Sequence, residues 1–125
     1  MKPNPVGWFE IYVKDMPRAK KFYESVFKFE LKPLPTEMPN LEMWSFPMDM
    51  NTPGAAGVLA KMEGFSPGNN GVLVYFSCED CAAEEKRVVP AGGKIQKPKT
   101  SIGEYGFISL VVDTEGNMFG LHSRQ

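Results

Sequence analysis

The sequence lacks several of the features by which common classes of protein are identified. No run of lysine or arginine stands out and the formal net charge is −1, so nucleic-acid binding is not expected. No segment approaches the roughly 18 consecutive apolar residues that a membrane-spanning helix needs, so no membrane partner is expected. Only two cysteines occur, in a single C-x-x-C. A structural zinc site needs further ligands, and no second C-x-x-C supplies them.

The N-terminal residues, Met-Lys-Pro-Asn-Pro, also lack the apolar stretch of a signal peptide. We therefore expect a cytoplasmic protein. Its 125 residues, of which 42% are hydrophobic, are enough for one globular domain with a buried core. The prediction is a single domain that covers residues 1–125.

What the chain does contain is a strand-to-helix pattern that occurs twice. In each copy an apolar strand ends at an aspartate that can cap a helix, Asp15 in the first and Asp80 in the second. An internal repeat of this kind predicts a duplicated module. We place the first module at about 5–63 and the second at about 70–123, with residues 64–70 as the linker between them.

The first strand and the first helix are indicated by different periodicities. Residues 6–13 alternate in the way that is typical of a strand. One face carries Phe9, Ile11 and Val13, and the other carries Trp8, Glu10 and Tyr12. After Asp15, apolar residues recur at helical spacing, which predicts an amphipathic helix. Its apolar stripe consists of Ala19, Phe22, Tyr23, Val26 and Phe27.

Further elements complete the same order in each half. The first half continues with strands at 29–34, 41–46 and 57–61. The second half has a strand at 71–77, a helix at 81–90, strands at about 93–96, 106–112 and 117–122, and a tight turn at Asp113–Gly116. The order is therefore βαβββ, twice. We predict an α+β fold in which two βαβββ modules form an eight-stranded, barrel-like cavity.

Three segments, in this order and spacing, resemble a known family. Residues 13–23, 91–95 and 113–121 are similar to the vicinal oxygen chelate superfamily, also called the glyoxalase/bleomycin resistance/dioxygenase fold. The segment Leu121-His122-Ser123 is similar to the end of small glyoxalase-like members. The resemblance implies eight strands around a pocket, a small-molecule ligand and commonly a homodimer.

The resemblance also locates the positions of metal ligands in the metal-using members. Those members place His, Glu or sometimes Gln at the start of the first strand and on the last strand of each module. The matching positions here are Trp8, Leu73 and Gly120, and strand 57–61 contains no carboxylate, histidine or cysteine. The side chains of Trp, Leu and Gly cannot coordinate a divalent ion. We therefore expect no metal and no cofactor, which disfavours a metal-dependent lyase or dioxygenase of the glyoxalase type.

The same positions indicate which residues face the cavity that the family implies. Alternation along three strands predicts an aromatic lining with one carboxylate and one imidazole. Its members are Trp8, Glu10, Tyr12, Leu73, Tyr75, Ser77, Met118, Gly120 and His122. Apolar walls with a few orienting polar groups suit an organic ligand. The leading hypothesis is a metal-independent, glyoxalase-like protein that binds a small aromatic or amphipathic molecule in a cavity between the modules.

Glu10 and His122 are the candidate catalytic residues. A carboxylate in an apolar pocket can act as an acid or a base, and an imidazole suits proton transfer or an anionic ligand. If the two face each other, the protein could be a metal-free isomerase or lyase. Glu10 could instead pair with a nearby lysine, tyrosine or backbone amide, and His122 could be held by a neighbour near the C-terminus. A binding protein and a metal-free enzyme both stay open.

Two further segments have a chemical and a structural interpretation. The C-x-x-C of Cys78 and Cys81 could serve redox or zinc chemistry. The repeat aligns these cysteines with Val13 and Met16, which favours packing in the core. The segment 94–106 could be a loop at the rim of the pocket, where a polar ligand would meet Lys97, Lys99, Thr100 and Ser101. A solvated connection between strands is the favoured interpretation.

Overall fold

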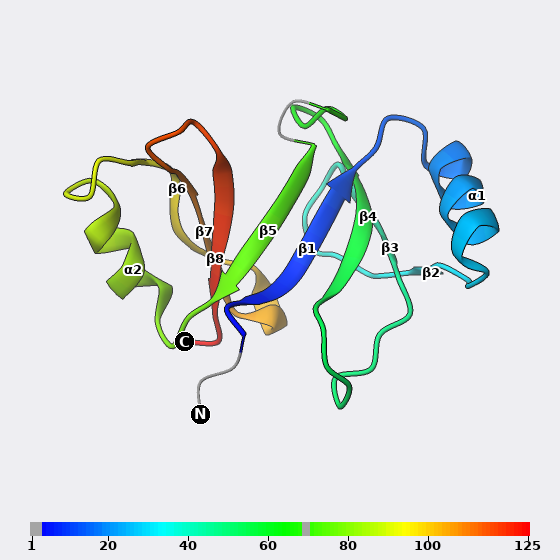
Figure 1. The fold of residues 1–125 in the computed structure, drawn as a ribbon, viewed down its shortest axis with the longest axis horizontal. Helices are drawn as coiled ribbons and strands as arrows, with labels where there is room; N and C mark the ends of the chain where they lie inside the picture. The colour runs from blue at the N-terminus through cyan, green and yellow to red at the C-terminus, as the bar shows by residue number, and fades with distance from the viewer. Residues whose placement is uncertain (1–3, 69–70) are drawn as a thin grey trace. The chain divides into compact units, whose positions relative to one another are not determined.

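The computed structural model of the chain describes residues 4–68 and 71–125 (Figure 1). The chain divides into two compact units, each with its own core. Module one is the unit Trp8–Val72, and module two combines Leu73–Gln125 with the segment that ends at Gly7. Of the predicted linker, residues 69–70 lie outside the described part of the chain.

Module one has four strands and a helix. Its elements are β1 (Val6–Tyr12), α1 (Met16–Phe27), β2 (Lys32–Pro33), β3 (Leu41–Ser45) and β4 (Ala56–Met62). β1 runs parallel to β4, and β3 lies antiparallel between β4 and β2. The order is βαβββ, as the sequence predicts.

Module two repeats this arrangement. Its elements are β5 (Val72–Ser77), α2 (Cys81–Val88), β6 (Lys94–Ser101), the 3₁₀ turn η1 (Gly103–Tyr105), β7 (Phe107–Val112) and β8 (Met118–Ser123). β5 is parallel to β8, and β7 lies antiparallel between β8 and β6. The α+β class and the two βαβββ modules are thus confirmed. Among the described residues, no helix has the length and hydrophobicity to cross a membrane.

Both helices begin at the aspartates that the repeat identifies. The Asp15 carboxylate accepts a hydrogen bond from the backbone N–H of Arg18 at 3.0 Å. The Asp80 carboxylate accepts one from the backbone N–H of Ala82, also at 3.0 Å. Each bond satisfies an N–H that has no partner within its helix, and this fixes where the helix starts.

Each helix packs its first residue into a separate core. In module one, Met16 is buried with Val13, Leu31 and Leu59. In module two, Cys81 is buried with Val111 and Leu121. Met16 and Cys81 hold equivalent positions in the repeat, which explains why a cysteine is found there as a small core residue.

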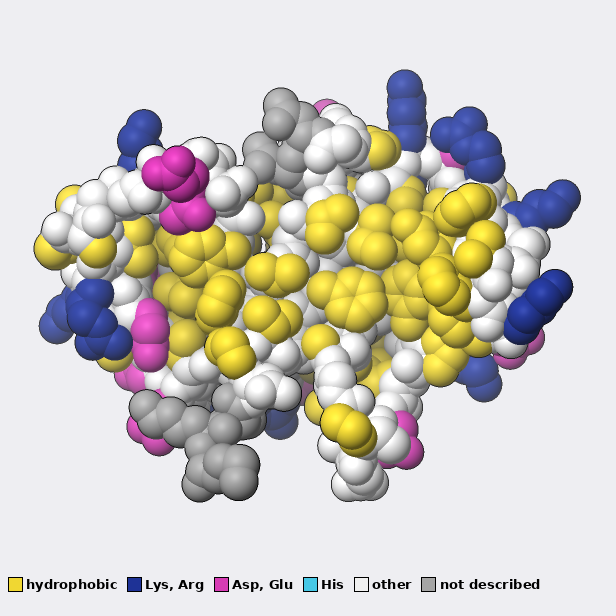
Figure 2. Space-filling model, in the orientation of Figure 1, with side chains coloured by type: hydrophobic (Ala, Val, Ile, Leu, Met, Phe, Trp, Pro, Cys, Tyr) yellow, Lys and Arg dark blue, Asp and Glu magenta, His cyan; other side chains and the backbone are white. Residues whose placement is uncertain are grey.

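The amphipathic helix predicted after Asp15 is present as α1, but its apolar stripe is only partly buried. Phe22, Val26 and Phe27 are 59%, 54% and 58% exposed. Only Ala19 and Tyr23 of the stripe pack against the core of module one, so the buried side of the helix is narrower than the periodicity suggests. Figure 2 shows apolar side chains gathered at the surface beside α1, with lysine and arginine side chains at the rim.

Several element boundaries differ from the sequence prediction. The strand predicted at 29–34 is reduced to β2, because the Glu24 side chain holds the backbone N–H of Leu31 at 2.8 Å in an irregular segment. The segment predicted as a rim loop is mostly strand, since β6 continues to Ser101. Its pairing with β7 shifts register between Lys97 and Thr100, and this irregularity accommodates Pro98 in the strand.

The turn between β7 and β8 is longer than predicted. The last paired residues are Val112 and Met118, so five residues form the connection. The Asp113 carboxylate accepts backbone N–H bonds from Glu115 and Asn117 at 2.8 and 2.9 Å. These bonds hold the pKa of Asp113 below its usual value.

Candidate functional site

Glu10 is held by its two aromatic neighbours on β1. The Trp8 indole N–H donates to Oε2 at 3.2 Å, and the Tyr12 hydroxyl donates to Oε1 at 2.6 Å. The shorter distance is typical of a charge-assisted O–H···O⁻ bond. The predicted grouping of Trp8, Glu10 and Tyr12 on one face of the strand is therefore present, with the carboxylate positioned between the two rings.

Apolar residues of β3 and β4 share the face of the sheet that carries this carboxylate, opposite α1. Residues paired across strands share a face, and the register pairs Glu10 with Val58, Tyr12 with Ala60, and Ala60 with Met43. Val58 and Ala60 are fully buried. We call this surface the Glu10 face. It consists of Trp8, Glu10, Tyr12, Met43, Val58 and Ala60.

Phe65 adds a residue to this surface that the sequence prediction missed. Its ring stacks on that of Tyr12 with centroids 4.6 Å apart. Phe65 lies in the segment 64–70, which the sequence predicts to be the linker between the modules. An aromatic residue between Gly64 and Pro67 is the only sequence signal that could have indicated this contact.

The second group of predicted lining residues lies on the corresponding face of module two, opposite α2. The register pairs Tyr75 with Gly120 and Ser77 with His122. Leu73 and Tyr75 are buried, and Met118 is half-buried. The alternating residues Phe76, Phe119 and Leu121 pack instead in the core beside α2. The alternation predicted for β5 and β8 is therefore correct.

His122 is engaged by the backbone within module two. Its Nε2 lies 2.7 Å from the carbonyl oxygen of Tyr105. Because a carbonyl oxygen only accepts, Nε2 carries a proton and donates it. A neighbouring group therefore holds His122, which is one of the two interpretations left open by the sequence. In the neutral ring, proton transfer would use Nδ1, because Nε2 is bonded to the carbonyl.

The residues that the family resemblance assigns to metal-ligand positions do not have the side chains that a metal ion requires. Trp8, Leu73 and Gly120 offer no side-chain ligand atom of the kind that divalent ions require. At Gly120 the space is also taken, since a Cβ there would overlap the ring of Tyr75. Over residues 4–68 and 71–125, no group of three or more His, Cys, Asp or Glu side chains could hold a metal ion.

The polar residues of β6 serve local structure. The Lys99 ammonium lies 2.7 Å from the Asp80 carboxylate, and its backbone N–H donates to Glu85 at 2.6 Å. The hydrogen bond between Lys99 and Asp80 lowers the pKa of Asp80 and raises that of Lys99. Ser101, a predicted ligand-binding residue, accepts a hydrogen bond from the backbone N–H of Gly103 at 3.2 Å. Its predicted role in ligand binding stays a prediction.

The two cysteines are not linked to each other. Cys81 is fully buried, and Cys78 is half-buried. Burial raises the pKa of Cys78 to about 11, and the nearby Glu84 carboxylate adds to the effect by disfavouring a second negative charge. A thiol with a raised pKa is a poor nucleophile at neutral pH, which argues against a redox role for this C-x-x-C.

We expect Cys78 to resist alkylation in the folded protein. At pH 8 a thiol with this raised pKa is about 0.1% thiolate, whereas an ordinary thiol is about 20% thiolate. Iodoacetamide should therefore modify Cys78 on the order of 100-fold more slowly than the urea-unfolded chain, with the rate rising up to pH 11. The measurement uses a Cys81→Ala variant. A rate that levels off below pH 9 would contradict this assignment.

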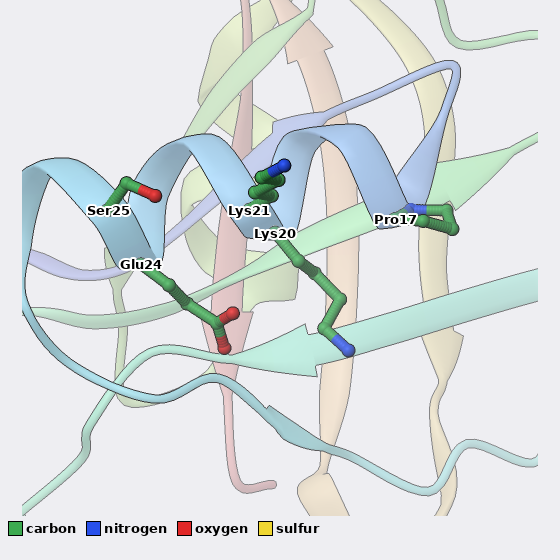
Figure 3. A pocket seen from close by; sticks show the side chains of 5 residues that line it. All are labelled: Pro17, Lys20, Lys21, Glu24 and Ser25. Atoms are coloured by element: carbon green, nitrogen blue, oxygen red, sulfur yellow. The ribbon is translucent and has the colours of Figure 1, made fainter.

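A shallow, open hollow of about 340 Å³ lies along α1 (Figure 3). It is lined by Pro17, Lys20, Lys21, Glu24 and Ser25. Its Lys20 ammonium lies 3.2 Å from the centroid of the Trp44 ring, and Glu24 holds the backbone of Leu31. The hollow contains none of the residues predicted from the sequence to bind a ligand. Two of its charged side chains, Lys20 and Glu24, already make contacts with other residues of module one.

Comparison with known proteins places these modules in a family. The family model of the Glyoxalase/Bleomycin resistance protein/Dioxygenase superfamily matches residues 6–121. The chain is 28% identical over 118 residues to proteins named "Putative glyoxylase CFP32" from Mycobacterium bovis and Mycobacterium tuberculosis. The alignment covers 92% of this chain and 44% of each relative, so the chain spans less than half the length of these curated relatives.

Solved structures with the same fold cover nearly the whole chain. A Streptomyces coelicolor methylmalonyl-CoA epimerase variant in complex with 2-nitronate-propionyl-CoA has a TM-score of 0.67 at 16% identity, over 98% of both chains. The hypothetical protein BH1468 from Bacillus halodurans has a TM-score of 0.72 at 13% identity, over 99% of this chain and 96% of its own. At these identities the likeness concerns the fold alone.

Proposed function

Because the chain belongs to the Glyoxalase/Bleomycin resistance protein/Dioxygenase superfamily, we propose that it binds a small aromatic or amphipathic molecule at the Glu10 face. Binding needs no metal ion at the family's ligand positions, which here hold Trp8, Leu73 and Gly120. The observation that carries the proposal is the carboxylate of Glu10, which Trp8 and Tyr12 hold in a fixed orientation.

The chemistry of the Glu10 face supports an organic ligand. Its walls are aromatic and aliphatic, so they favour contact with apolar groups of a ligand. The single carboxylate supplies orientation, because two hydrogen bonds restrict its rotation before any ligand arrives. Stacking of Phe65 on Tyr12 further limits movement of the Tyr12 ring.

A metal-free isomerase or lyase is the second candidate. Glu10 lies within hydrogen-bond reach of the Tyr12 hydroxyl, so a proton could pass between a bound molecule and this pair. His122 would act through Nδ1, since Nε2 is bonded to the Tyr105 carbonyl. This candidate requires that Glu10→Gln and His122→Gln each abolish turnover. A binding protein requires only that Glu10→Gln weaken binding.

A thermal-shift screen tests the binding proposal. Indole, p-cresol and benzyl alcohol at millimolar concentrations are the probes, and binding to the folded state raises the Tm. We expect at least one probe to stabilise the wild type and Glu42→Ala but not Glu10→Ala. Glu42 is a matched control, because its carboxylate accepts from the Trp44 indole N–H at 2.9 Å on β3 of the same module.

The screen has an outcome that refutes the proposal. Equal stabilisation of Glu10→Ala and the wild type by every active probe would show that Glu10 takes no part in binding. The His122→Ala variant separates the two candidates, because binding at the Glu10 face alone predicts that its thermal shift equals that of the wild type.

A further inference from the structure

We propose that Phe65 determines the size of the ligand that the Glu10 face accepts. The inference rests on the proposed function and identifies a specificity-determining residue for it. Phe65 follows β4 and adds one more ring to the aromatic residues of this face, Trp8 and Tyr12. Because the Phe65 ring occupies the space beside Tyr12, it restricts a ligand to the rest of the face.

The Phe65 ring lies against one face of the Tyr12 ring. The two ring centroids are 4.6 Å apart and the ring planes are inclined by 22°, which is a stacked arrangement. Phe65 is half-buried, and Tyr12 is only 6% exposed. An aromatic ligand cannot reach the covered face of Tyr12 without displacing Phe65. The protein itself therefore fills the space that one further aromatic ring would need beside Tyr12.

Backbone hydrogen bonds define the position of Phe65 beside β1. The Phe65 N–H donates to the Met62 carbonyl at the end of β4, at 3.2 Å. Gly64 lies between them with φ of 94°, a conformation that glycine adopts without a steric penalty. Further along the chain, the Gly71 carbonyl accepts from the Tyr12 N–H at 2.6 Å. These bonds fix where the segment leaves β4 and where it returns to Tyr12.

Shortening Phe65 to alanine would open an apolar space about the size of one aromatic ring beside Tyr12. Apolar spaces of this kind stay free of water and bind aromatic molecules. The second ring of a naphthalene compound matches the ring that the variant loses, so the variant should accept a two-ring ligand better than the wild type does. Replacing Phe65 with the larger tryptophan should have the opposite effect.

Two neutral alcohols that differ by one fused ring test the inference. Benzyl alcohol and naphthylmethanol carry the same hydroxymethyl group, so they differ in size and not in charge. Dissociation constants from NMR titrations give a size ratio, defined as the affinity for naphthylmethanol divided by the affinity for benzyl alcohol. We expect Phe65→Ala to raise this ratio on the order of tenfold above the wild type, and Phe65→Trp to lower it.

Phe22→Ala is the matched control for Phe65→Ala. Phe22 also contacts a tyrosine of module one, since its ring centroid lies 5.2 Å from that of Tyr23. This pair lies on α1, away from the Glu10 face, and Phe22 is 59% exposed. We therefore expect Phe22→Ala to keep the wild-type size ratio. If Phe65→Ala does not fold, Phe65→Leu takes its place, because leucine removes the ring, keeps an apolar side chain and should also raise the ratio.

The outcomes separate the inference from the proposed function. A wild-type size ratio in Phe65→Ala, or in Phe65→Leu where it takes its place, would overturn the inference. The proposed function would still stand if the wild type binds benzyl alcohol and Glu10→Ala weakens that binding. An equal rise of the ratio in Phe22→Ala would also overturn the inference, because the added affinity would not come from the space beside Tyr12. If neither alcohol binds the wild type or any Phe65 variant at millimolar concentration, both the inference and the proposed function fail.

Discussion

Leu59→Ala is expected to lower the free energy of unfolding by about 2–5 kcal/mol. Leu59 lies in β4, is 0% exposed, and packs in one cluster with Val13, Met16 and Leu31. Removing its side chain loses buried apolar area and leaves a cavity that the surrounding helix and strands fill only in part. Urea denaturation followed by circular dichroism measures the change.

Val26→Ala is the matched control for the Leu59 prediction. Val26 lies on α1 of the same module but is 54% exposed. Its truncation should change the free energy of unfolding by less than about 0.5 kcal/mol. Equal destabilisation of the two variants would contradict the assignment of Leu59 to the core of module one and of Val26 to its surface.

Gly120→Ala is expected to destabilise the protein by about 1–3 kcal/mol, because it forces a methyl group into occupied space. A Cβ at this position would overlap the ring of Tyr75, which is buried on the neighbouring strand. The glycine is thus required by the packing of the ring. Denaturant unfolding of the purified variant measures the effect.

A double-mutant cycle with Tyr75→Ala identifies the cause. In the Tyr75→Ala background the ring is gone, so adding Gly120→Ala should cost less than about 0.5 kcal/mol. An unchanged penalty in that background would mean that the backbone at Gly120, and not the Tyr75 ring, excludes a side chain. The cycle also bears on the position that the family resemblance assigns to a metal ligand, since any side chain at Gly120 would need the space of the Tyr75 ring.

The repeat explains how much of the fold could be predicted. Capping aspartates and alternating strands are local signals, so both helix starts and both βαβββ orders follow from the sequence. The exposure of Phe22, Val26 and Phe27 could not be predicted, because periodicity defines an apolar stripe but not how much of it the strands cover. The sequence predicts a strand at about 93–96 only, whereas β6 extends to Ser101, because register shifts in its pairing with β7 accommodate Pro98 within the strand.

The sequence predicts which residues of the candidate site share a face of a strand, but it does not predict the hydrogen bonds between their side chains. Alternation along β1 predicts that Trp8, Glu10 and Tyr12 share one face, and the hydrogen bonds among their side chains agree with this grouping. The assignment of Trp8, Leu73 and Gly120 to metal positions stays a prediction. The hydrogen bonds to Glu10 depend on side-chain rotamers, which a sequence pattern does not define. The bond from His122 to the Tyr105 carbonyl joins residues that are 17 positions apart through η1, and no local pattern indicates it.

The most direct test of ligand binding at the Glu10 face is a two-dimensional ¹H–¹⁵N NMR titration of the two tryptophan side chains. The chain has two tryptophans, and each indole N–H donates to a glutamate. On titration with benzyl alcohol, we predict that the Trp8 indole signal moves in a saturable way while the Trp44 signal stays in place. A moving Trp44 signal with an unmoved Trp8 signal, or no movement of either, would contradict ligand binding at Glu10.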